Sequence, residues 1–97
     1  MNYPFEQIQK DNITIRTFSS MVDETELIWH RDKQDRVVTV LEGKGWQLQI
    51  DNQLPVRMVV GESYFIPKMV YHRIIKSQEN KLVLRIKENV NIQTIPC

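Results

Sequence analysis

The chain has 97 residues, with 13 lysines and arginines against 12 aspartates and glutamates, and a net charge of +1. This length fits one domain with a thin core, and the near-balance of scattered charges gives no electrostatic basis for nucleic acid or an acidic membrane as partner. The one cysteine, Cys97, excludes an intrachain disulfide. Residues 1–12 lack the apolar segment of a signal peptide, and no apolar run approaches the ~20 residues of a membrane span, so we expect a cytoplasmic protein.

Short runs of alternating apolar and polar residues predict strands in the first half of the chain. We expect strands at residues 13–18, 26–32 and 37–41, the last almost wholly β-branched and apolar, as in a strand buried on both faces. Residues 42–45 then predict a hairpin turn, in which Gly43 and Gly45 are available for positive φ. Residues 46–51 alternate strictly and predict the next strand.

The second half of the chain continues the pattern. Strands are expected at residues 56–60, 63–66, 71–76 and 82–87, with polar turns between them. Residues 89–97 form either an edge strand or a tail. About eight short strands in so short a chain predict an all-β closed barrel or sandwich.

Alternation along the expected strands brings candidate functional residues together. His30 and Asp32 share one face of their strand, and His72 shares a face with aliphatic neighbours. If both histidines face inward, they would line a mostly apolar pocket with a few polar groups. The opposite assignment buries Trp29 and Tyr71 instead, and alternation alone leaves both assignments open.

Two segments carry a recognisable spacing. The first contains His30, Asp32, Asp35, Arg36 and Gly43, and the second contains Gly61, Pro67, Met69, His72 and Lys76. Over roughly residues 26–86 this spacing resembles the cupin superfamily, the small double-stranded β-helix (jelly-roll) barrels. The resemblance implies a single cupin-like domain over residues 1–97, with the core barrel at roughly 13–88.

The first cupin motif is only partly kept. His30 and Gly43 match its first histidine and its glycine, whereas Asp32 stands at the second histidine and Arg36 at the glutamate, with Asp35 one step earlier. In the second motif the glycine, proline and histidine are matched, while a methionine replaces the second glycine and a lysine replaces the closing asparagine.

The resemblance implies a metal site with an altered ligand set. Cupins generally bind a divalent metal through three histidines and one glutamate, and here the candidates are His30, Asp32 and His72. Two histidines and a carboxylate suit Fe(II), and also Mn(II), Ni(II) or Zn(II). The corresponding function is a metal-dependent oxygenase or isomerase acting on a small molecule.

Arg36 supports a different interpretation, because a guanidinium beside a metal cation is repulsive. It either pairs with Asp32 in a polar cluster without metal, where it could also receive an anionic group of a ligand, or belongs to the turn and points to solvent while Asp35 reaches inward. The alternative function is a non-catalytic cupin that has lost its metal and binds an organic acid or a sugar-like ligand. Trp46 and Tyr64 are further ligand-binding candidates, although strand periodicity favours the core for Trp46.

We also expect a homodimer. Pairing of edge strands between two copies would hide exposed strand edges and enlarge the small core.

Overall fold

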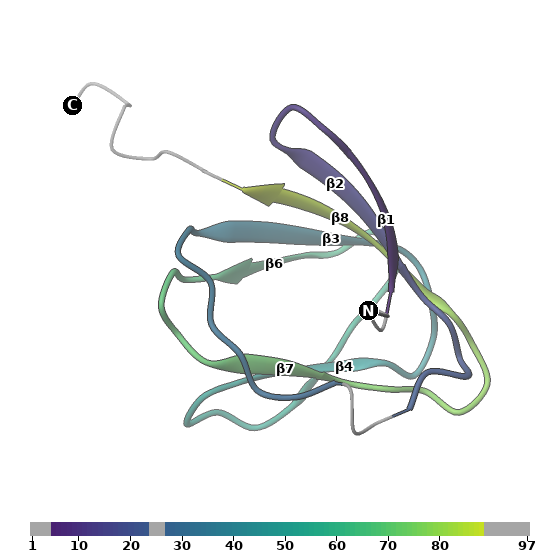
Figure 1. Cartoon of the computed structure of the whole chain (residues 1–97). Coiled ribbons are helices and arrows are strands. Elements are labelled where there is room, and N and C mark those ends of the chain that lie inside the picture. Colours follow the sequence, from purple (N-terminus) through teal and green to yellow (C-terminus); the bar gives the residue numbers. More distant parts are fainter. Residues whose placement is uncertain (1–4, 24–26, 89–97) are drawn as a thin grey trace.

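The computed structural model describes residues 5–23 and 27–88, which form eight strands in two facing sheets (Figure 1). All strand pairs are antiparallel, and this part of the chain contains no helix, so the expectation of an all-β jelly-roll fold is confirmed. Within the described residues there is accordingly no helix that could span a membrane. Residues 89–97, expected to form an edge strand or a tail, lie outside the described residues.

The larger sheet has five strands, in the order β1-β2-β8-β3-β6. These strands are β1 (Glu6–Lys10), β2 (Ile13–Phe18), β8 (Leu82–Glu88), β3 (Arg36–Glu42) and β6 (Ser63–Ile66). A bulge between Val40 and Glu42 shifts the pairing of β3 with β8. The larger sheet thus places β2 and β3 on either side of β8.

The smaller sheet has three strands, in the order β5-β4-β7. These strands are β5 (Val56–Arg57), β4 (Gln47–Ile50) and β7 (His72–Ile75). On the side of β7 away from β4, one isolated antiparallel bridge joins His30 to His72. The segment around His30 therefore extends the smaller sheet by a single residue pair.

The core lies between the two sheets. The strands that line the core alternate between inward and outward side chains, most regularly in β8, whereas β1 and β5 are exposed throughout. The buried apolar residues are Phe18, Val22, Val38, Val40, Trp46, Leu48, Met58, Ile66, Leu82, Leu84 and Ile86. Trp46 has no exposed surface, and its indole Nε1 donates a hydrogen bond to the Asn80 carbonyl at 2.8 Å, so its polar atom is satisfied in the core.

Several expectations about strands were wrong, and one strand was not expected. The strand expected at residues 56–60 is limited to Val56–Arg57. The described part of residues 26–32 pairs only at His30, because the segment is held by one bridge and by loop contacts. β3 is buried on one face only, since Leu41 is 44% exposed. β1 was not expected, because its residues are exposed on both faces and carry no apolar alternation.

The turns carry the positive φ angles that the fold requires. Gly43 and Gly45 have φ of 137° and 87°, so the expected positive φ angles are present. The expected hairpin at residues 42–45 was wrong, because β3 and β4, which this turn connects, belong to different sheets and do not pair. Gly61 also has positive φ, at 89°. Met69, at the position of a glycine in the cupin motif, has φ of 63° and so adopts the left-handed conformation that glycine accepts without steric cost.

Replacing Met69 by glycine should stabilise the protein. The Met69 side chain is 48% exposed and contributes little packing, so relief of the left-handed backbone should raise the free energy of unfolding by about 0.5–1 kcal/mol. Urea denaturation would measure this change. Met69→Ala is the matched control, because it removes the side chain and keeps the strain; equal stabilisation by both variants would contradict the backbone explanation.

Candidate metal centre

Two backbone hydrogen bonds place His30 and His72 directly opposite each other. The His30 amide donates to the His72 carbonyl at 3.0 Å, and the His72 amide donates to the His30 carbonyl at 2.8 Å. Residues paired in this way on antiparallel segments direct their side chains to the same face. The two imidazole rings accordingly lie edge to face, with their centroids 4.3 Å apart.

The turn after β6 positions Asp32. The Met69 amide donates to the Asp32 carbonyl at 2.6 Å, and the Lys68 amide donates to Asp35 Oδ1 at 2.8 Å. The segment that contains Lys68 and Met69 therefore holds the segment that contains Asp32 and Asp35 in place through its backbone amides. Asp35 is committed to this turn.

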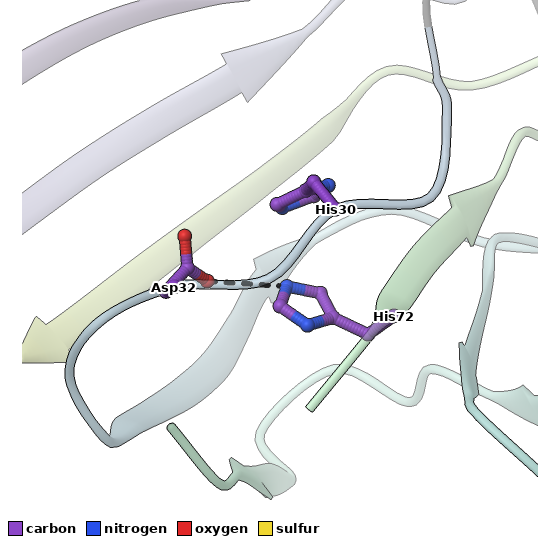
Figure 2. A group of neighbouring side chains, drawn as sticks. All are labelled: His30, Asp32 and His72. Carbon is purple, nitrogen blue, oxygen red and sulfur yellow. Dashed lines mark ion pairs between the residues drawn. The ribbon is translucent and has the colours of Figure 1, made fainter. Parts of the chain in front are cut away.

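His30, Asp32 and His72 converge as the sequence predicted (Figure 2). Each offers one ligand atom, and these atoms all lie within 4.8 Å of one another. Asp32 Oδ2 is 3.3 Å from His72 Nε2. Bonds of about 2.1 Å from one metal ion to two ligand atoms place those atoms roughly 3–4 Å apart, so small side-chain adjustments would suffice to bind an ion.

The protonation of the two rings follows from their backbone contacts. Nδ1 of His30 lies 3.1 Å from the Ile28 carbonyl, and Nδ1 of His72 lies 3.0 Å from the Val70 carbonyl. A carbonyl oxygen only accepts, so each neutral ring carries its hydrogen on Nδ1 and a lone pair on Nε2. This is the arrangement of a histidine that binds metal through Nε2.

The electrostatics of the cluster keep Asp32 and His30 in the forms that bind metal. Burial would raise the pKa of the Asp32 carboxyl, but the His72 ring and the Arg36 guanidinium outweigh it and hold that pKa below its usual value. Burial lowers the pKa of His30 from its ordinary value, despite the opposing contact with the Ile28 carbonyl. At neutral pH the cluster thus presents a carboxylate and a neutral His30.

Arg36 faces the cluster, which decides between the alternatives left open by the sequence. Its Nη1 is 3.1 Å from Asp32 Oδ2, and its Nη2 and Nε are 2.7 and 2.8 Å from Glu88 Oε2. Arg36 is therefore paired with two carboxylates. Oδ2 of Asp32 is nevertheless buried and accepts no hydrogen bond of good geometry from the described residues.

A cavity of about 480 Å³ adjoins the cluster between the two sheets. Most of its lining is aliphatic or aromatic, and its polar lining residues are Arg16, His30, Asp32, Arg36 and His72. A largely apolar cavity of this size with a few convergent polar groups is typical of a small-molecule site.

Two other predicted ligand-binding residues lie elsewhere. Trp46 is packed in the core, and the Tyr64 hydroxyl donates to the Arg57 carbonyl and accepts from the Val59 amide. Neither is among the described residues that line the cavity. A ligand-binding role for Trp46 or Tyr64 stays a prediction.

The sequence analysis missed Arg16 and Glu88. Arg16 lies on β2 between two buried residues, Thr14 and Phe18, which are each two positions away. Strand alternation alone could have placed Arg16 on the inner face with these residues. Glu88 had no such signal, because its role depends on the pairing of β8 with β3.

Comparison with known proteins supports the fold. No protein-family model and no curated protein matches the chain. Among solved structures, a cupin-2 domain protein from Shewanella frigidimarina aligns with a TM-score of 0.61 and 23% identity, covering 89% of this chain and 79% of that chain. An RmlC-like cupin with a double-stranded β-helix fold from Methanocaldococcus jannaschii aligns with a TM-score of 0.68 and 15% identity, covering 87% and 76%.

A further structural neighbour is the iron(II) form of HppE in complex with its substrate. It aligns with a TM-score of 0.65 and 14% identity, covering 91% of this chain and 54% of that chain. Together these neighbours show that the chain has the double-stranded β-helix fold of cupin-domain proteins, and the predicted resemblance to the cupin superfamily is confirmed at the level of the fold.

Loss of the Arg36 guanidinium should destabilise the protein. Arg36→Gln leaves Asp32 and Glu88 without their shared cation in a partly buried setting, and we expect the free energy of unfolding to fall by about 1–3 kcal/mol. The exposed Arg85 on the outer face of β8 gives the matched control, Arg85→Gln, which should change stability by no more than about 0.5 kcal/mol. Equal unfolding free energies for the two variants would mean that the Arg36 pairs contribute nothing net.

Proposed function

We propose that the chain binds a divalent metal ion through His30, Asp32 and His72, and that a small organic molecule reaches this ion from the adjoining cavity. One observation carries the proposal. His72 Nε2, which bears a lone pair when Nδ1 donates to Val70, faces the Asp32 carboxylate at 3.3 Å. Two acceptors at this distance would repel each other, so a proton or a metal ion has to lie between them. The lowering of the Asp32 pKa by His72 corresponds to the pair with a proton between them, and a metal ion would replace that proton.

The donor set fits such an ion. Two histidines and one carboxylate on one face leave coordination positions open, and this set is typical of Fe(II) and also accepts Mn(II), Ni(II) or Zn(II). When bound, the metal would polarise or activate an oxygen of a small molecule. One of the neighbours is an iron(II) protein with bound substrate, which supports a metal-dependent reaction on a small molecule; within that range we propose an oxygenase or isomerase.

The chain's own residues would perform the remaining tasks. The carbonyls of Ile28 and Val70 hold the two rings with Nε2 directed away from the backbone. Arg36 restrains the Asp32 carboxylate, because it is itself held by Glu88. The apolar walls of the cavity would exclude water and orient the ligand's carbon skeleton.

Metal binding tests the proposal directly. Titration of the metal-free protein with Zn²⁺, followed by calorimetry, should give one ion per chain. Asp32→Asn and His72→Ala should each weaken binding at least about 100-fold, because each removes one of three ligands. Asp51→Asn, at an exposed aspartate, is the matched control and should bind as the unsubstituted protein does. Zinc binding that is absent, or unchanged in Asp32→Asn, would refute the metal site.

The ion pair between Arg36 and Asp32 favours a second candidate, a metal-free cavity that binds an organic acid or a sugar-like molecule. In this case Arg36, at 3.1 Å from Asp32, would take the place of the metal as counter-ion of the carboxylate.

Arg36→Gln separates the two candidates. If the metal site is functional, removal of a positive charge beside Asp32 should strengthen Zn²⁺ binding by about tenfold. If the protein instead functions without a metal, as in the second candidate, neither the unsubstituted protein nor this variant should bind Zn²⁺ with one-to-one stoichiometry. Calorimetric titration of both proteins measures the difference.

A further inference from the structure

A second guanidinium lines the cavity, and the metal site makes no use of it. Arg16 extends from the inner face of β2, where it is opposite Leu84 of β8, and it is half-buried. Leu84 in turn lies opposite Val40 of β3. Arg16 therefore stands on the wall of the larger sheet, among apolar neighbours.

The contacts of Arg16 hold its guanidinium but do not neutralise it. Its Nε donates to Gln7 Oε1 at 3.0 Å, and its Cζ lies 3.9 Å from the centroid of the Phe5 ring. Within residues 5–23 and 27–88, no carboxylate forms an ion pair with Arg16, and neither Nη1 nor Nη2 has a hydrogen-bond partner. The free edge of the guanidinium is the edge that binds a carboxylate through two parallel hydrogen bonds.

Arg36 differs from Arg16 in this respect. Arg36 is paired with Asp32 and with Glu88, so its charge is already balanced. The carboxylates of Asp32 and Glu88 thus both pair with the guanidinium of Arg36, and neither forms an ion pair with Arg16. A divalent ion on His30, Asp32 and His72 would add further positive charge, so the cavity as a whole would attract an anion.

The environment of Arg16 makes its charge costly. Burial lowers the pKa of Arg16 to about 10, and the positive charge of Arg36 contributes to the shift, while Asp32 and Glu88 oppose it. An anionic group on the free edge would offset this cost by supplying the missing counter-charge.

We propose that Arg16 binds the carboxylate of a small organic acid that occupies the cavity. The proposal rests on the proposed function for one point only, that the other end of the acid lies toward His30, Asp32 and His72. The sequence analysis considered Arg36 as the residue that receives an anionic group of the ligand; in this proposal that residue is Arg16. Phe5 and Gln7 act as positioning residues, because they fix the plane of the guanidinium.

The walls define the class of ligand. One unpaired guanidinium matches one negative charge, and the largely apolar lining matches a hydrocarbon skeleton. A free inorganic anion such as phosphate would lose its hydration against these walls without gaining enough hydrogen bonds. A monocarboxylic acid with an aliphatic or aromatic body fits both features.

Hexanoate and hexanamide form a matched pair of probes, because they share a carbon skeleton and differ in charge. Binding of each would be measured by NMR titration of the ¹⁵N-labelled protein, without metal and with saturating Zn²⁺, and inorganic phosphate would serve as the third probe. The variants are Arg16→Gln, Arg16→Lys and the control Arg85→Gln. Thermal unfolding of each variant would verify the fold, and Arg16→Gln should remain folded because it removes an unpaired charge.

We expect hexanoate to bind the unsubstituted protein and Arg85→Gln at least about tenfold more tightly than hexanamide, the typical effect of one charge-assisted contact. Arg16→Gln should abolish this preference, and Arg16→Lys should restore part of it. Equal binding of the two probes, an unchanged preference in Arg16→Gln, or phosphate binding as tight as that of hexanoate would overturn the assignment.

The same samples distinguish the failure of this inference from the failure of the metal site. Arg16→Gln should bind one Zn²⁺ per chain, as the unsubstituted protein does, because Arg16 is not a ligand of the ion. Zinc binding without a carboxylate preference would refute the role of Arg16 alone. A carboxylate preference that depends on Arg16, in a protein that binds no Zn²⁺, would support Arg16 and refute the metal site.

Discussion

The site depends on one pair of backbone hydrogen bonds, those between His30 and His72. They attach a segment with no strand of its own to the edge of the smaller sheet, and they force both imidazole rings onto the face that lines the cavity. The amide of Met69 then fixes the carbonyl of Asp32. Because these bonds involve only backbone atoms, they do not depend on which side chains occupy the ligand positions.

Charge is distributed unevenly within an otherwise apolar cavity. Asp32, Arg36 and Glu88 form a chain of ion pairs in which one guanidinium pairs with two carboxylates, while the partners of Arg16 among the described residues are an amide oxygen and an aromatic face. An unbalanced charge in surroundings of low dielectric constant costs free energy. A charge such as that of Arg16 therefore indicates a binding site. A metal ion and an organic anion are the two ligands whose charges complement this arrangement.

Much of the fold was predictable, because alternation records burial directly. The strands at residues 13–18 and 63–66 coincide with β2 and β6, and the glycines of the turn at residues 42–45 have the expected positive φ, although this turn crosses between the two sheets. Alternation of apolar and polar residues did not predict strands correctly where a segment pairs without being buried, or has the pattern without pairing. β1 pairs along its whole length while exposed on both faces, and the segment around His30 has a strand-like pattern but pairs at one residue.

The sequence by itself determined which residues could share a face: the spacing of His30 and Asp32, and the two segments that resemble the cupin motifs. Only the tertiary structure decided that Arg36 rather than Asp35 faces the cavity, that Glu88 pairs with Arg36, and that no carboxylate of residues 5–23 and 27–88 pairs with Arg16. Alternation is a local property with a period of two residues, whereas ion pairing depends on the register between strands far apart in the chain. That register is set by the packing of the whole barrel.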